Sequence, residues 1–119
     1  MNKLTKLGAR RLRKLAKILD TADALHKKRG EPRYNQQIYQ YDCGTPACAW
    51  GHYVLSDAKI VKRLGMRDSV YAGFHTEQEF GIHVSEADEL FGLAGCGHAE
   101  TAKQAAAYIR SFVKRKGIV

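Results

Sequence analysis

The sequence is short of cysteine and has no long apolar run, and each shortage excludes a class of protein. Three cysteines in 119 residues are too few, and odd in number, for a disulfide scaffold. No stretch reaches the roughly 18 consecutive apolar residues that a membrane-spanning helix needs. A hydrophobic fraction of 45% and a charged fraction of 27% are ordinary for globular proteins and argue against disorder. With no internal repeat or linker, residues 1–119 are predicted to form a single domain.

Acidic residues are scarce at the start of the chain. Residues 1–33 contain eleven Lys and Arg but only three Asp and Glu, which gives this segment a net charge of +8. Residues 34–119 contain nine bases and nine acids, so the whole excess of positive charge lies in the first 33 residues. This asymmetry indicates a polyanionic partner, whether nucleic acid, an acidic protein surface or an anionic lipid surface.

The basic segment also lacks the apolar core of a secretory signal, because bases interrupt every apolar stretch up to Lys17. A transit peptide is the alternative, since the segment is basic, amphipathic and free of acids through Lys17. It contains no Ser, however, and acids with a second basic cluster follow it. We therefore expect a cytoplasmic protein whose thiols are reduced.

Apolar periodicity predicts one long helix over residues 3–28. Leu12, Leu15 and Leu19 recur at helical spacing, and Gly30 with Pro32 ends the helix. Gly8 lowers helix stability by about 1 kcal/mol relative to Ala, so we expect fraying before residue 9.

Capping signals predict the remaining helices. Thr45 is the predicted cap of a second helix that begins at Pro46, and two short helices follow over residues 58–64 and 85–91. Thr101 with Gln104 forms a capping box that opens a last helix ending at Gly117. The residues of that helix predicted to face the core are Ala102, Ala105, Ala106, Ile109, Phe112 and Val113.

The predicted fold class is mainly α: a single compact helical domain with a long basic N-terminal helix. Residues 1–33 form that helix and its stop, and residues 34–119 form a neutral helical body. Residues 66–84 are ambiguous, because two short strands at 70–74 and 80–84 compete with a helical turn over residues 76–79. A short β-hairpin around residues 70–84 is therefore the alternative for that segment.

Cysteine and histidine gather in two places. Cys48 and His52 are four residues apart on the second predicted helix, and the Cys96–Gly97–His98 run lies in a glycine-rich loop. Zinc is the cofactor that such thiols and imidazoles suit, and the candidate ligands are Cys43, Cys48, His52, Cys96 and His98. The spacing differs from that of typical structural zinc sites. The alternatives are a Cys43–Cys48 disulfide and plain packing of buried thiols, and packing is the expectation, with no cofactor.

Nucleophilic catalysis is a further alternative for the same residues. Cys43 precedes a predicted helix start, where aligned N–H groups lower the pKa of a thiol, and His83 or His98 would serve as the base. His83 directly precedes a predicted helix cap, and no orienting residue follows it. We therefore expect a protein without enzymatic activity.

One segment is similar to known sequences. The run Cys43-Gly44-Thr45-Pro46-Ala47-Cys48-Ala49-Trp50-Gly51 resembles a Cys-Gly-Thr-x-Ala-Cys-x-x-Gly signature of small, uncharacterised proteins of bacteria and their phages. Those proteins are similar again in a Leu-Phe pair before a loop and an alanine-rich helix, as in residues 90–91 and 102–112 here. The resemblance covers residues 43–113 and implies a phage or mobile-element origin. It brings no activity with it.

Nucleic acid is the predicted partner. A basic stripe recurs at helical spacing on the first helix and consists of Lys3, Lys6, Arg10, Arg13 and Lys17, widened by Arg11 and Lys14. Such a stripe is suited to phosphates, which gives salt-dependent binding with little sequence selectivity. Lys114, Arg115 and Lys116 would extend it if the two terminal helices pack side by side. Tyr34, Tyr39 and Tyr41 are candidates for stacking on unpaired bases.

Two other partners remain alternatives for the basic helix. The first is an acidic surface of a host protein, in which case the protein acts as an interaction partner or inhibitor. The second is a membrane surface, although the apolar face of the predicted helix lacks Trp and Phe.

Overall fold

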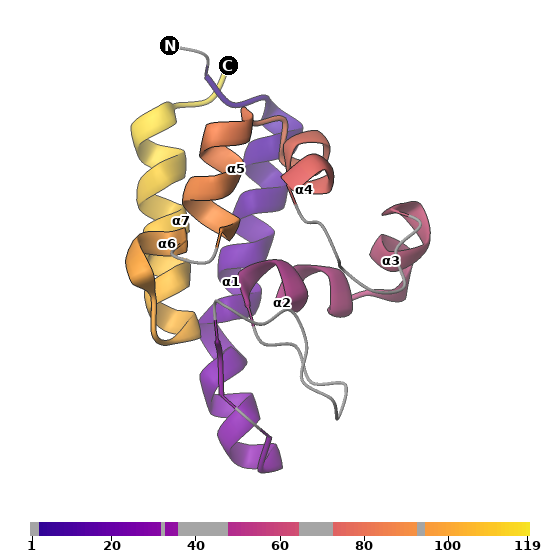
Figure 1. The fold of residues 1–119 in the computed structure, drawn as a ribbon, viewed down its shortest axis with the longest axis vertical. Helices are drawn as coiled ribbons and strands as arrows, with labels where there is room; N and C mark the ends of the chain where they lie inside the picture. The colour runs from indigo at the N-terminus through magenta and orange to yellow at the C-terminus, as the bar shows by residue number, and fades with distance from the viewer. Residues whose placement is uncertain (1–2, 32, 36–47, 65–72, 93–94) are drawn as a thin grey trace.

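The computed structural model describes residues 3–31, 33–35, 48–64, 73–92 and 95–119. These residues are helical apart from short connections and a single parallel β-bridge between Leu4 and Ile118. The helices in chain order are α1 (Lys6–Arg29), α2 (Ala49–Leu55), α3 (Ala58–Leu64), α4 (Gly73–Phe80), α5 (Val84–Phe91), α6 (Gly95–His98) and α7 (Ala102–Lys116) (Figure 1). The predicted mainly α fold with a long N-terminal helix is confirmed.

The long helix α1 begins and ends on specific caps. The Thr5 hydroxyl accepts a hydrogen bond from the N–H of Gly8, and Gly30 closes the other end in the left-handed conformation with φ 68°. Leu12, Leu15 and Leu19 are completely buried, as the sequence pattern predicts. The expected fraying before residue 9 is wrong, because Gly8 is buried against the backbone of α4.

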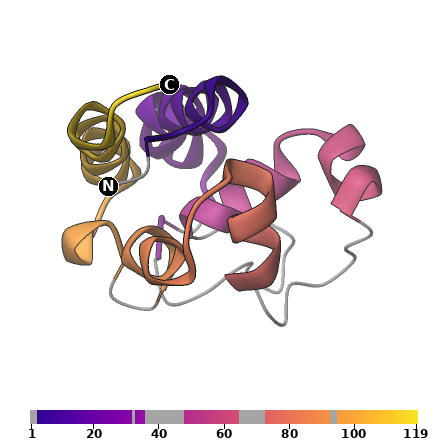
Figure 2. The ribbon, with the colours of Figure 1, turned by 90° about the horizontal axis from the view of Figure 1, so that it is seen from above.

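Helix α7 packs antiparallel against α1 along most of its length (Figure 1). At the start of α7, the Asp23 carboxylate accepts hydrogen bonds from the N–H groups of Ala102 and Lys103, both at 3.1 Å. At the other end, the N–H of Leu4 donates to the carbonyl oxygen of Gly117 at 2.9 Å. Both ends of the pair are therefore fixed, and α1 and α7 form one layer across which α2, α4 and α5 lie (Figure 2).

The core lies between these two layers. Phe112 and Ile109 of α7 meet Leu12, Leu15 and Leu19 of α1 there, and all five are at most 1% exposed. On the other side, the ring of Phe80 lies 5.0 Å from that of Tyr53 and 5.3 Å from that of Phe91. Burial of these rings joins α2, α4 and α5 into one body under α1.

Several predicted helix ends are confirmed and others are wrong. The capping box of Thr101 and Gln104 is present, and all six predicted core residues of α7 are buried. Helix α5 begins one residue earlier than predicted, because His83 serves as its cap. Helix α2 begins at Ala49 with Cys48 as its cap in an extended conformation, so the predicted start at Pro46 is wrong. Thr45 and Pro46 themselves lie outside the described residues.

The alternative of a β-hairpin around residues 70–84 is wrong over the part that the structure describes. Residues 73–80 are the helix α4, and α5 begins at residue 84. Thr76, Glu79 and Phe80 are all buried on one side of α4, at the spacing of three and four that a helix requires. Residues 70–72 lie outside the described residues.

None of the described helices combines the length and the apolar character needed to cross a bilayer.

Candidate functional site

The outer face of α1 carries a dense row of exposed bases. Counting about 100° per residue around the helix places Lys6, Arg10, Arg13, Lys14 and Lys17 on the side opposite the buried leucines. All five are exposed, and so is Lys3 just before the helix. Five of the bases predicted from the sequence therefore share one solvent-facing surface, which we call the outer face of α1. Lys3 lies at its end, beside Gly117.

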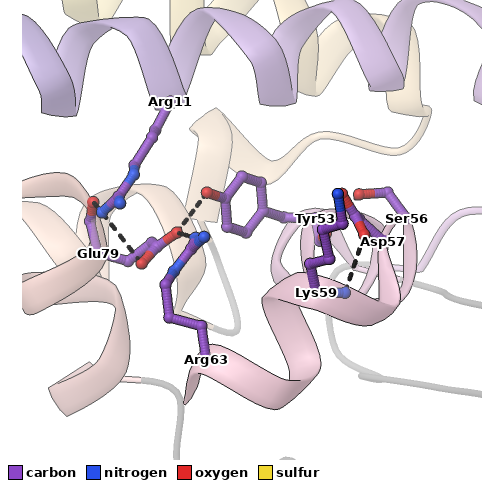
Figure 3. Close-up of polar contacts among 7 residues, drawn as sticks. All are labelled: Arg11, Tyr53, Ser56, Asp57, Lys59, Arg63 and Glu79. Carbon is purple, nitrogen blue, oxygen red and sulfur yellow. Dashed lines mark hydrogen bonds and ion pairs between the residues drawn. The ribbon is translucent and has the colours of Figure 1, made fainter.

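Arg11 belongs to a different part of the molecule, which corrects the predicted stripe. It follows Gly8 by three residues and precedes Leu15 by four, so it borders the buried side of α1. Its guanidinium donates to the backbone carbonyl of Glu79 at 2.9 Å and to the carboxylate of Glu79 at 3.2 Å (Figure 3). Arg11 is therefore paired with Glu79 inside the protein and does not contribute to the outer face.

Glu79 is the centre of a buried polar cluster. Its side chain is 3% exposed and also accepts hydrogen bonds from Arg63 of α3 and from the hydroxyl of Tyr53 of α2 (Figure 3). Burial and this hydrogen bond raise the pKa of Tyr53. A buried carboxylate with this many donors is paired and satisfied, so the cluster joins four helices and lacks a free acid or base for catalysis.

Other carboxylates are also used within the fold. Asp20 pairs with Arg110 across the junction of α1 and α7, and this hydrogen bond lowers the pKa of Asp20. Asp23 accepts the N–H groups of Ala102 and Lys103 at the start of α7. Within the described residues, none of the five bases on the outer face forms an ion pair with a carboxylate. Their positive charge is therefore directed to solvent without local compensation.

The basic end of α7 adds one base to this surface rather than three. Arg115 pairs with Glu89 and Lys116 pairs with Glu86, each at 2.6 Å, on the side of α7 that faces α5. Lys114 is exposed and has no carboxylate partner among the described residues. The terminal helices do pack side by side, but only Lys114 is left to extend the basic surface.

No three of the predicted zinc ligands form a group within the described part of the chain. Neither Cys48, His52, Cys96 nor His98 belongs to a described group of three or more His, Cys, Asp or Glu side chains that could hold a metal ion. Cys48 accepts the N–H of Gly51 at 3.3 Å, and Cys96 donates to the carbonyl oxygen of Leu90 at 3.2 Å. Cys43, and with it the predicted disulfide and the predicted nucleophile, lies outside the described residues.

Burial keeps both described thiols protonated. It raises the pKa of Cys48 and raises that of Cys96 to about 12. The two candidate bases are His83, which caps α5, and His98, which is exposed on a turn. That turn has left-handed backbone at Cys96, with φ 53°, and at His98, with φ 61°. It borders an open hollow of about 490 Å³ with Tyr108 and Ser111 on the opposite wall.

His52 is engaged by a residue that the sequence analysis missed. The Nδ1 atom of His52 lies 2.7 Å from the carbonyl oxygen of Cys48, which accepts, so Nδ1 carries the proton and Nε2 is an acceptor. The Nε2 atom of His26 donates to it at 2.8 Å. Burial lowers the pKa of His52 to about 4, which agrees with a neutral ring.

The two rings meet head-on, which favours a hydrogen bond over a shared metal ion. Their centroids are 5.1 Å apart for a nitrogen separation of 2.8 Å, so the nitrogens lie almost on the line between the rings. A metal ion bound by both nitrogens would need two rings that converge at an angle. The pair instead links α1 to α2, beside a largely apolar cavity of about 330 Å³ whose walls include Leu25 and Leu55. A signal in the sequence exists: His26 continues the spacing of Leu15, Leu19 and Ala22.

Two further expectations change with burial. Tyr34 is 4% exposed and stacks on His52 with centroids 5.7 Å apart, so it cannot stack on a base. Tyr39 and Tyr41 lie outside the described residues. Leu12, Leu15 and Leu19 of α1 are buried in the core and are not free to insert into a membrane surface, whereas Leu7 and Leu25 are exposed.

Comparison of the chain with protein-family models, with curated proteins and with solved structures finds no significant match.

Proposed function

We propose that the protein binds nucleic acid through its phosphates, using the outer face of α1, without catalysis and with little preference for sequence. The observation that carries the proposal is the set of five exposed bases of that face, none of which forms an ion pair within the described residues. Arg11 lies in the same basic run of the sequence but forms an ion pair with Glu79, which none of those five bases does.

The arrangement has the features of a phosphate-binding surface. The bases from Lys6 to Lys17 span eleven residues, or roughly 16 Å along a helix that rises about 1.5 Å per residue. Packing against α7 and α4 holds this helix in place, so the charges are pre-organised. Contacts to phosphates supply affinity and position but carry no sequence information.

The experiment is fluorescence anisotropy with a labelled random-sequence oligonucleotide at several salt concentrations. Five phosphate contacts predict that log K falls with log salt at a slope of about −4.5 for a DNA duplex and about −3.5 for a single strand. The variant R13Q/K17Q is expected to reduce the magnitude of that slope by about 2. The control K59Q/K62Q removes the same charge from exposed positions of α3 and is expected to leave the slope unchanged.

Two results would overturn the proposal. One is an R13Q/K17Q variant that binds as the wild type does. The other is a wild-type protein that fails to bind any oligonucleotide at low salt. If it then binds an acidic polypeptide such as poly-glutamate, with loss in R13Q/K17Q, the same face serves an acidic protein surface. That result would favour the alternative of an interaction or inhibitor protein.

A further inference from the structure

The junction between α1 and α7 extends the basic surface beyond α1. The pair of Arg110 with Asp20 shows which side of α7 borders the outer face of α1. Lys103 precedes Arg110 by seven residues and Lys114 follows it by four, so both lie in the same row of α7 as Arg110. Lys103 and Lys114 are exposed. A second row of bases therefore runs along α7 beside the junction.

The row on α1 faces this second row. Arg13 precedes Asp20 by seven residues and Lys6 precedes it by fourteen, so all three lie close to one line along α1. Because the helices are antiparallel and Leu4 bonds to Gly117, Lys114 stands near the first turns of α1, towards Lys6 and Arg10. Asp20 is already paired with Arg110, and Asp23 accepts the N–H groups of Ala102 and Lys103 at the start of α7. The bases that face each other without a described carboxylate partner are therefore Lys114 and the row on α1.

Two parallel rows of bases suit a different partner from a single row. Packed helices have axes about 8–10 Å apart, so the two rows are separated by a distance of the order of a nucleic-acid groove, about 6–12 Å wide in B-form DNA. A duplex presents one line of phosphates on each side of a groove, whereas a single strand presents only one line. Single strands are also held by stacking on exposed aromatic rings, and none of the described aromatic side chains is exposed.

We propose that the α1–α7 junction binds double-stranded nucleic acid across a groove. The α1 row contacts one phosphate backbone and the α7 row, with Lys103 and Lys114, contacts the other. This inference rests on the proposed function, and it assigns to α7 a role that a single-stranded partner would not require.

The test compares three probes of equal length by anisotropy: a 20-base-pair DNA duplex, the matching RNA duplex and a single strand. The variant K103Q/K114Q is expected to weaken duplex binding about tenfold at 100 mM salt and to reduce the magnitude of the salt slope by about 2. It is expected to leave single-strand binding within about twofold of the wild type, since a single line of phosphates is served by α1. The control K59Q/K62Q removes the same charge away from the junction. The tighter of the two duplexes identifies the source of the phosphates.

The inference fails if K103Q/K114Q binds the duplexes as the wild type does, or if the single strand binds more tightly than both duplexes. If R13Q/K17Q loses affinity in either case, the proposed function survives. If R13Q/K17Q has no effect on any probe, the proposed function fails and the duplex inference fails with it.

Discussion

Replacement of Gly8 by Ala has two opposite effects on the free energy of unfolding: it improves helix propensity, and it disturbs the packing of α1 on α4. A Cβ atom at this position would lie 2.1 Å from the carbonyl oxygen of Phe80, where ordinary contact begins at 3.4 Å. The neighbouring atom is backbone, so α1 and α4 would have to separate by more than about 1 Å. Overpacking of this kind costs about 1–3 kcal/mol, whereas Ala in place of Gly gains about 1 kcal/mol in a helix. We expect Gly8→Ala to lower the free energy of unfolding by up to about 2 kcal/mol, measured by urea denaturation.

A matched control separates the two effects. Ala24 is exposed on the same helix, and Ala24→Gly is expected to cost about 1 kcal/mol through propensity alone. Ala is thus expected to give the more stable protein at position 24 of α1, and Gly the more stable protein at position 8. A Gly8→Ala variant that is more stable than the wild type would refute the close approach of α4 to α1. It would also restore the interpretation of Gly8 as a simple weak point of the helix.

Three other perturbations test the remaining contacts. Burial lowers the pKa of His52 from 6.5 to about 4, so the unfolded chain binds this proton at a higher pH than the folded protein does. The free energy of unfolding should therefore fall by up to about 3 kcal/mol as the pH drops from about 6.5 to 4. In denaturation curves, His52→Gln should make this pH dependence smaller. Asp23→Ala removes the carboxylate that accepts the N–H groups of Ala102 and Lys103 at the start of α7, and it should lower the unfolding free energy by about 1 kcal/mol in urea. Glu89→Gln releases Arg115 on the side away from the outer face and raises the net charge of the protein by one. Oligonucleotide affinity should stay within about twofold of the wild type. A rise in affinity comparable to the loss in R13Q/K17Q would show that net charge alone drives binding.

The terminal helices were predictable because their signals are local. The leucine spacing of α1 and the capping box of α7 depend only on residues within a few positions of one another. The start of α2 was not predictable in this way. Thr45 and Pro46 are the stronger local signal, yet the cap is Cys48, a residue type that seldom caps a helix. A buried thiol that accepts the N–H of Gly51 becomes the cap because the tertiary structure places it there.

Contacts between distant segments set the limit of sequence reasoning at the site. Arg11 and Arg10 are adjacent and chemically identical, and nothing local reveals that Glu79 lies 68 positions away to receive one of them. Arg115 and Lys116 are taken by α5 in the same way, whereas Lys114 is not. The spacing of Arg11 relative to Gly8 and Leu15 did place it at the edge of the buried side. That signal was present but was outweighed by the run of bases around it.

The ion pairs within the fold decide which bases of the asymmetric sequence remain uncompensated at the surface. Residues 34–119 are neutral in total, but three of their acids form ion pairs within the fold: Glu79 with Arg11 and Arg63, and Glu86 and Glu89 with the end of α7. Asp20 and Asp23 of α1 are spent on α7. A fold that consumed its acids evenly would leave a weakly basic surface everywhere. This one leaves a dense row of uncompensated bases on the outer face of α1 and on the adjoining row of α7, whereas the exposed bases of α3 are only Lys59, Lys62 and the paired Arg63. An extended anion therefore contacts several uncompensated bases at once along α1.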